Sequence, residues 1–232
     1  MRFKNLVIIG TSHIARQSLD DVRSVIASEK PEIIALELDR NRAHALLTGQ
    51  KAKPGFAELR RFGVKGFLFG ILAAWAEKKL GSLVGVAPGS EMLLALKIAH
   101  ESHIGIAYID QDISLTLRRL SAAITWKEKW YFVADIFKAV VLRENELGFD
   151  MSKVPSGQII RRLMEKFRKR YPSLYHVLVV ERNIHMANRL ESIISSNPDL
   201  KVVAIVGAGH EDDVGRIVGN RLVRGSARTL RG

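Results

Sequence analysis

Four short apolar runs, separated by longer amphipathic stretches, dominate the hydrophobic pattern of this chain. The runs span Asn5–Ile9, Ile33–Leu38, Ile104–Ile109 and Val202–Val206. Each is rich in isoleucine, valine, leucine or alanine, and none alternates cleanly with polar positions, which is typical of parallel strands covered on both faces. The pattern therefore predicts an α/β fold with a central, mostly parallel sheet flanked by helices.

Helical spacing of apolar residues fills the intervals between these runs. It predicts a helix over Ser18–Ser28 and another over Glu91–His100, with Ser90 as the N-cap of the second. A third helix begins at Trp126, and its apolar face includes Trp130. The helices predicted between the third and fourth apolar runs cover residues 126–143, 158–169 and 171–195.

These elements divide the chain into three parts, with a helical insertion before the last strand. We expect an α/β core of residues 1–120 and 198–215, a helical subdomain of residues 121–197, and a basic tail of residues 216–232. Within the core, the stretch Val64–Trp75 is apolar or small on every side. Such a helix is buried, lies in a subunit interface or contacts a membrane, and we favour burial or a homodimer.

Composition narrows the chemistry and the compartment. The 232 residues are 47% hydrophobic, enough to form a substantial core, and the absence of cysteine excludes disulfides, thiolate nucleophiles and cysteine-bound zinc. The first residues run directly into a strand without the features of a signal peptide. No stretch reaches the roughly 18 apolar residues of a spanning helix. We expect a cytoplasmic or peripherally membrane-associated protein.

The formal net charge of +12 is concentrated in two places, Arg161–Arg170 and the tail after Gly215. Such clusters attract the phosphates of nucleic acid or of anionic lipid, although a solvated face and a disordered tail would have the same composition. No RNA-binding motif, zinc finger or long basic helix accompanies the charge. Contact of the basic tail with an anionic membrane surface therefore remains open, and nucleic acid is not expected.

Two of the predicted strands end in the same pattern, a glycine followed three residues later by a histidine. The first gives Gly10 and His13, and the second gives Gly207 and His210. Ligands of open α/β sheets bind at the carboxyl ends of the strands, so the two histidines could meet there. Neutral imidazole is a common ligand for zinc, manganese or cobalt. The alternative is two unrelated turns with hydrogen-bonded histidines.

Carboxylates stand at the same edge of the predicted sheet. Glu37 and Asp39 end the second strand, and Asp110 and Asp112 follow the third. They could complete a metal site or act as a general base, or they could cap helices and face solvent. Glu91 occupies the first turn of a predicted helix, where the helix dipole would stabilise it or where it could point into a cleft.

Glu181 and Arg182 interrupt an apolar face within a predicted helix. Buried charges are costly unless they are paired or functional, so either these residues belong to a site or they face solvent. An arginine in a cleft can bind a carboxylate or stabilise an oxyanion.

Taken in order along the chain, these phrases resemble the TraB/PrgY family, whose members are often described as pheromone shutdown proteins. The matching pieces are Gly10-Thr11-Ser12-His13, Glu37-Leu38-Asp39-Arg40-Asn41-Arg42, Pro88-Gly89-Ser90-Glu91-Met92, Asp110-Gln111-Asp112-Ile113 with Thr116-Leu117-Arg118-Arg119, Glu181-Arg182-Asn183 and Val206-Gly207-Ala208-Gly209-His210. Where the family often has Asp-Arg-Asp, this chain has Gln111 in the middle position.

The resemblance implies a site, because the wider clan includes Tiki proteins, described as metal-dependent proteases with two Gly-x-x-His motifs. It implies that His13, His210 and Glu91 hold a divalent ion such as manganese, cobalt or zinc. Glu37 and Glu91 are both candidates for ligand or general base, and Glu37 is assigned as the base. Arg119 and Arg182 would bind the substrate carboxylate or stabilise the transition state.

Two functions follow as hypotheses. The first is a metal-dependent hydrolase, in particular a peptidase. The second is a binding protein that sequesters a peptide without cleaving it, which also agrees with inhibition of a peptide pheromone.

Overall fold

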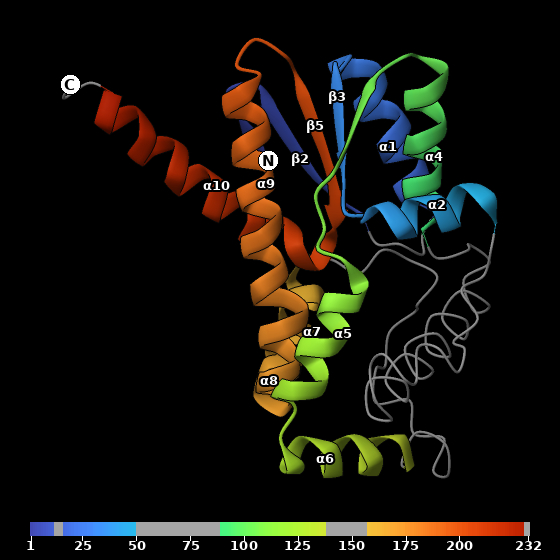
Figure 1. Ribbon diagram of the computed structural model, residues 1–232, viewed down its shortest axis with the longest axis vertical. Helices are drawn as coiled ribbons and strands as arrows, with labels where there is room; N and C mark the ends of the chain where they lie inside the picture. Colours follow the sequence, from blue (N-terminus) through green and yellow to red (C-terminus); the bar gives the residue numbers. More distant parts are fainter. Residues whose placement is uncertain (12–15, 50–88, 138–156, 230–232) are drawn as a thin grey trace.

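The structure is a computed structural model that describes residues 1–11, 16–49, 89–137 and 157–229. Its centre is a five-stranded sheet with the strand order β1-β2-β5-β3-β4 (Figure 1). The strands are β1 (Arg2–Phe3), β2 (Leu6–Thr11), β3 (Ile33–Leu36), β4 (Gly105–Tyr108) and β5 (Val202–Gly207).

The sheet is mostly parallel, which confirms the predicted fold class. β5 pairs in parallel with both β2 and β3, and β4 pairs in parallel with β3. Only the short β1, which the apolar pattern did not predict, is antiparallel to its neighbour among the described strands. All six residues of β5 are buried, because neighbouring strands flank it and helices cover both faces of the sheet.

Helices from separate parts of the sequence cover the two faces of the sheet (Figure 1). On one face lie α1 (Arg16–Glu29) and α4 (Ser90–Glu101), whose apolar residues join the core that contains Ile205. On the other face lie α9 (Arg182–Ser196) and α10 (Ala208–Thr229), in the core that contains Ala204. α2 (Arg40–Thr48) follows β3 directly. Adjacent residues of β5 thus contribute to opposite cores, as expected for a strand.

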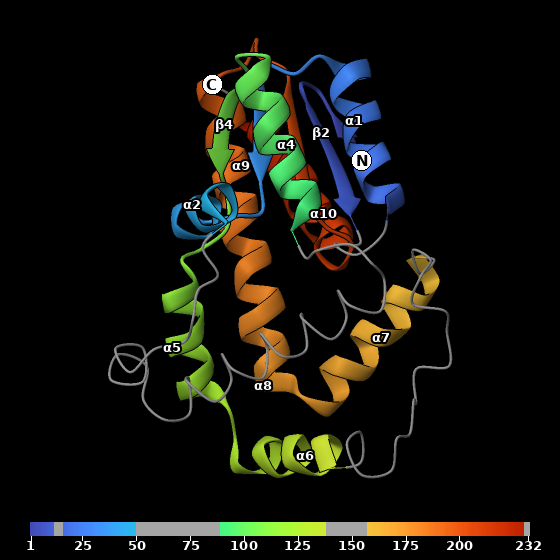
Figure 2. The ribbon, with the colours of Figure 1, turned by 90° about the vertical axis from the view of Figure 1, so that its right-hand side faces the viewer.

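A second group of helices extends beyond the carboxyl ends of the strands (Figure 2). It comprises α5 (Ile113–Ala123), α6 (Trp126–Phe137), α7 (Gly157–Arg170), α8 (Pro172–Tyr175) and the π-helix η2 (His176–Glu181). The group has a small core of its own, formed by Leu120, Ile124, Leu174 and Val177. The sequence predicts a helical insertion before the last strand, but this group differs from it at both ends, because α5 begins within the predicted core and α9 packs on the sheet. The group lies at the sheet edge that carries the candidate chemistry.

Three sequence-based expectations about elements are wrong in detail. Gly89, with φ of 80°, is the N-cap of α4, and Ser90 is the first helical residue. The helix predicted over residues 171–195 is divided into α8, η2 and α9. The basic tail is not disordered up to Thr229, because α10 continues to that residue.

No described helix is long and apolar enough to cross a membrane. The apolar stretch Val64–Trp75 lies outside the described residues.

Candidate functional site

Acidic and basic side chains meet where the parallel strands end. Glu37 comes directly after β3, Asp110 follows β4, and His210 lies in the first turn of α10 just after β5. Glu37 and Asp110 are buried, with side chains that are 5% and 2% exposed. Parallel strands bring their carboxyl ends to the same edge, so residues distant in the sequence gather at one place.

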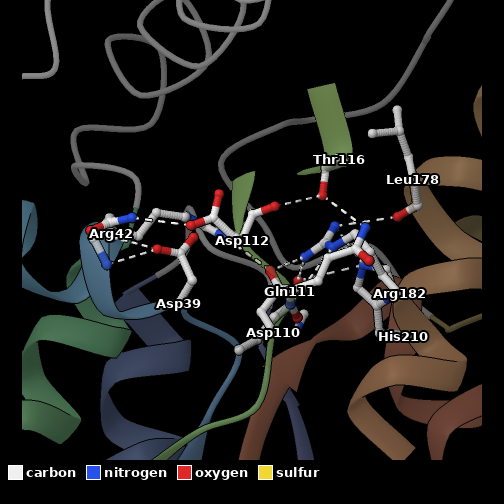
Figure 3. A network of polar contacts seen from close by, with 12 residues as sticks. Asp39, Arg42, Asp110, Gln111, Asp112, Thr116, Leu178, Arg182 and His210 are labelled. Atoms are coloured by element: carbon white, nitrogen blue, oxygen red, sulfur yellow. Dashed lines mark hydrogen bonds and ion pairs between the residues drawn. The ribbon is translucent and has the colours of Figure 1, made fainter. Parts of the chain in front are cut away.

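Arg182 is the centre of this group (Figure 3). Its Nε donates to Asp110 Oδ1 at 3.0 Å, and its Nη2 donates to Asp110 Oδ2 at 2.8 Å and also contacts Glu37 Oε1. Burial lowers the pKa of Arg182, but the charges of Glu37 and Asp110 raise it more, so the pKa is raised above its usual value. The guanidinium is therefore a permanent positive charge between two buried carboxylates.

The π-helix determines where Arg182 stands. η2 ends at Glu181 and α9 begins at Arg182, so the arginine lies at the junction of two helical geometries. Its Nη1 donates back to the carbonyl oxygen of Leu178 at 3.3 Å. π-helical segments are rare and occur frequently at functional sites. The two charges that interrupt the apolar face in the sequence thus mark a real break in the helix.

His210 is held in one orientation by Asn183. The amide nitrogen of Asn183 donates to Asp213 Oδ2 at 3.3 Å, which leaves its oxygen to accept from His210 Nδ1 at 2.6 Å. The proton of a neutral His210 is then on Nδ1, and the lone pair is on Nε2. That Nε2 lies 3.5 Å from Glu37 Oε1 and 3.4 Å from Arg182 Nη1.

The acids of the site already have hydrogen-bond partners. Glu37 Oε2 accepts from the backbone N–H of Gly207 at 2.6 Å, which joins the ends of β3 and β5. Asp110 Oδ2 also accepts from Arg42 Nη1 at 3.0 Å, in addition to its bond with Arg182. Charge-assisted bonds of this kind fix a site rigidly.

The other two acids predicted at the strand ends cap helices. Asp39 Oδ1 accepts from the backbone N–H groups of Asn41 and Arg42 at the start of α2. Asp112 Oδ1 accepts from the N–H of Ser114 at the start of α5. The capping role predicted for Asp112 is confirmed, and Asp39 also caps a helix but is buried and does not face solvent. Asp39 Oδ2, however, is buried and has no hydrogen-bond partner within the described parts of the chain.

The remaining predicted site residues are placed as follows. Glu91 is 1% exposed and lies in the first turn of α4. The helix α4 leads into β4, which is parallel to β3, so the first turn of α4 lies at the carboxyl edge of the sheet. Arg119 does not join Arg182 but pairs with Glu181 at 3.1 Å, and its side chain is 54% exposed. His13 lies outside the described residues.

Gly10 lets the strand β2 pack closely against the start of α10. A Cβ at this position would lie 3.1 Å from the Cα of Ala208, the first residue of α10, and would collide with the Glu211 side chain. The first glycine of the repeated pattern therefore allows β2 to approach the helix that carries His210.

Sequence reasoning gave no role to Asn183 or Arg42. Asn183 could have been found from its position directly after Glu181 and Arg182. Three consecutive polar residues point in different directions around a helix, so at least one of them had to face the apolar side. Arg42 carried no such signal, because an arginine in the first turns of a helix usually faces solvent.

The donors at this edge fit a divalent ion by type. His210 presents an imidazole nitrogen whose partner nitrogen is fixed by an amide, which is the arrangement of a metal-bound histidine. Glu37 supplies a carboxylate oxygen 3.5 Å from that nitrogen. No group of three or more histidine, cysteine or acidic residues in metal-binding geometry occurs among the described residues, which do not include His13.

Comparison with known proteins gives the family. Residues 3–214 match the model of the TraB/PrgY/gumN family. The chain belongs to this family. An uncharacterized protein of Methanocaldococcus jannaschii is 35% identical over 218 residues, which cover 91% of this chain and 53% of that protein. TraB domain-containing proteins of Bos taurus and Homo sapiens are 25% and 23% identical over 231 residues.

This TraB-family chain is shorter than its relatives. The alignments with the two mammalian proteins cover 88% of this chain, but only 59% of the Bos taurus protein and 60% of the Homo sapiens protein. The chain thus spans somewhat more than half the length of the curated relatives that it matches. The resemblance found in the sequence is confirmed at the level of the family.

Proposed function

We propose that this TraB-family chain is a metal-dependent hydrolase that cleaves an amide bond, in particular a peptide bond, at the carboxyl edge of its sheet. The supporting observation is the approach of His210 Nε2 to Glu37 Oε1, 3.5 Å apart and beside Arg182. Two electron-rich atoms at this distance need a positive charge close to both, and the Arg182 guanidinium, which contacts each of them, supplies one. In this proposal, a divalent ion bound at His210 adds to this charge, beside Glu37 as the base.

The protein's own residues divide the work in this proposal. Asn183 orients His210 so that Nε2 faces the site. Glu37 takes the proton of the attacking water, exchanging its bond with Arg182 for one with that water. Arg182 lies between the two acids, where its charge stabilises the oxyanion of a tetrahedral intermediate.

His210 would hold a divalent ion, manganese, cobalt or zinc, with Glu91 and His13 as further ligands implied by the family. Such an ion lowers the pKa of a bound water and polarises a carbonyl group. Arg119 is proposed to bind the substrate carboxylate, which is supported by its exposure and by its pairing with Glu181, the neighbour of Arg182.

The proposal is tested by peptide cleavage. Purified chain is treated with a chelator, reloaded with manganese, cobalt or zinc, incubated with a peptide library and examined by mass spectrometry. We expect cleavage that requires an ion and falls about a hundredfold or more in His210→Ala, a loss typical for a group that acts in the transition state. The control His100→Ala changes an exposed histidine of α4 and should cleave normally. No cleavage with any of the three ions would contradict the proposal.

A second candidate, peptide binding without cleavage, is favoured by one observation. Both oxygens of Glu37 and both of Asp110 already accept hydrogen bonds, so neither of these two acids can act as a base without rearrangement. Calorimetry with peptides from the same library distinguishes the two candidates. Measurable affinity with intact peptide after incubation supports sequestration, and cleaved peptide supports hydrolysis. A homodimer stays a prediction under either.

A further inference from the structure

The helix α6 presents two tryptophans to solvent. Trp126 and Trp130 are 73% and 70% exposed, and they stand four residues apart, so they lie on the same side of the helix. Figure 2 shows α6 at the end of the molecule farthest from the sheet. Large aromatic side chains exposed side by side are unusual on a protein surface and commonly mark a contact surface.

The acids of α6 face the opposite way. Glu128 is 2% exposed, and its carboxylate accepts from the N–H and hydroxyl of Thr125 and from the N–H of Ser173. Asp135 pairs with Arg170 at 2.7 Å and accepts from the hydroxyl of Tyr171. Glu128 therefore points into the molecule and Asp135 is held in a partly exposed ion pair, whereas the tryptophans face outward, the reverse of an ordinary surface helix.

Lysines flank the exposed tryptophans. Lys129 places its ammonium 4.4 Å from the centre of the Trp126 ring, and Lys127 lies 5.6 Å from that of Tyr131. The acids of α6, Glu128 and Asp135, are engaged by residues of other elements, so the side that carries the tryptophans is basic in composition. We call Trp126, Lys127, Lys129 and Trp130 the α6 face.

We propose that the α6 face binds the surface of an anionic phospholipid bilayer, with α6 lying in the interface. Tryptophan favours the headgroup level of a bilayer, and lysine beside it is attracted to anionic lipid. A helix with aromatic and basic residues on its outward side is the kind that binds in this way. The surface is distinct from the basic tail predicted from the sequence as a membrane contact.

Charge and geometry favour lipid over two other occupants. A second copy of the chain would bring Lys127 and Lys129 of each copy close together, and like charges across an interface are costly. Single-stranded nucleic acid would need open ring faces for base stacking. One face of Trp126 is covered by Lys129, whereas insertion at the headgroup level needs no stacking.

Flotation of the full chain with vesicles tests the proposal. The vesicles contain phosphatidylcholine alone or phosphatidylcholine with about 30% phosphatidylserine at low salt. We expect partition only with phosphatidylserine, weakened about thirtyfold in Lys127→Ala/Lys129→Ala, since each lysine near the surface contributes about a factor of five. Trp126→Ala/Trp130→Ala should lose about tenfold or more.

Control variants remove the same number of positive charges, or an exposed apolar side chain, elsewhere on the surface. Arg23→Ala/Lys97→Ala takes two exposed basic residues from α1 and α4, and Leu47→Ala takes an exposed leucine from α2. Both should bind within about twofold of wild type. Circular dichroism melts verify that every variant is folded, and single substitutions of Trp126 and Trp130 replace the double variant if it is not.

Three results would overturn the proposal. The first is vesicle binding that is absent, or that the α6 variants keep in full. The second is a dimer, seen by light scattering without lipid, that the tryptophan variants dissociate. The third is binding to single-stranded RNA that the α6 variants lose while vesicles do not bind the wild type.

Discussion

At the scale of single residues, the site depends on one buried cation. Arg182 has a side chain only 16% exposed and bonds both Glu37 and Asp110, so its removal would leave two buried carboxylates without their main partner. Unpaired buried charges cost far more free energy than paired ones.

We predict that Arg182→Met lowers the free energy of unfolding by about 3–5 kcal/mol at pH 7, because methionine keeps the volume but not the charge. Urea denaturation measures the change. The control Arg119→Met breaks the exposed pair with Glu181 and should cost less than about 1 kcal/mol. Equal stability of the two variants would show that Arg182 does not carry the network.

Asn183 is predicted to set the tautomer of His210. In Asn183→Ala the Nδ1 proton loses its acceptor, and we expect the nitrogen-15 shifts of His210 to move away from those of the Nδ1–H form. The lost bond should also cost about 1–3 kcal/mol of stability. Asn188→Ala, an exposed change on the same helix, serves as the control. Unchanged His210 shifts would mean that another group orients the ring.

Much of the site was predictable at this scale, and the reasons for success and failure are physical. Strand ends are visible as the ends of apolar runs, so His210, Glu37 and Asp110 could be assigned to one edge. Pairing between distant side chains is not visible in the pattern. Arg119 and Arg182 therefore looked alike in the sequence, whereas the structure separates them: one pairs with Glu181 and the other with Glu37 and Asp110.

At the scale of elements, α6 shows what periodicity can and cannot predict. Helical spacing correctly started this helix at Trp126 and predicted an apolar face that includes Trp130. Periodicity does not tell which side faces the molecule, and an apolar stripe is normally assumed to face inward. Here Glu128 faces inward because it caps the first turn of its own helix and also binds the N–H of Ser173 at the start of α8.

Glu128 should make the free energy of unfolding depend on pH in the acidic range. Burial raises the pKa of Glu128, but hydrogen bonds from Thr125 and Ser173 together lower it further, so the net pKa lies below its usual value. A carboxylate with a lowered folded pKa stabilises the protein above its unfolded pKa of about 4.3 and loses that effect as pH falls through the folded value.

We therefore predict that Glu128→Gln lowers the free energy of unfolding by about 1 kcal/mol at pH 7 and by much less near pH 3. Thermal melts across this range measure the difference. Asp20→Asn, which removes an exposed carboxylate of α1, should change the melting temperature little at pH 7. A deficit in Glu128→Gln that stays constant with pH would contradict the assignment.

At the scale of the whole molecule, β5 holds the fold together. It comes late in the sequence yet lies between β2 and β3, and every residue in it is buried. The four parallel strands could be predicted from their apolar runs, but their order could not, because strand order depends on contacts between residues far apart in the chain. The antiparallel β1 is too short to leave a pattern.

We predict that Ile205→Ala in β5 costs about 2–5 kcal/mol, since a fully buried isoleucine leaves a cavity when truncated. Ile106→Ala on the edge strand β4, where the side chain is 38% exposed, should cost well under half as much. Urea denaturation of both variants checks this. Similar losses would show that β5 is no more central to stability than the sheet edge.

The most direct test of the proposed hydrolase is its metal content. The purified chain is treated with a chelator, reloaded with manganese, cobalt or zinc, dialysed and measured by plasma mass spectrometry, beside His210→Ala and the control His100→Ala. We predict stoichiometric binding of an ion in wild type and control, and its loss in His210→Ala. Equal metal content in all three proteins, or stoichiometric metal in none, would contradict it.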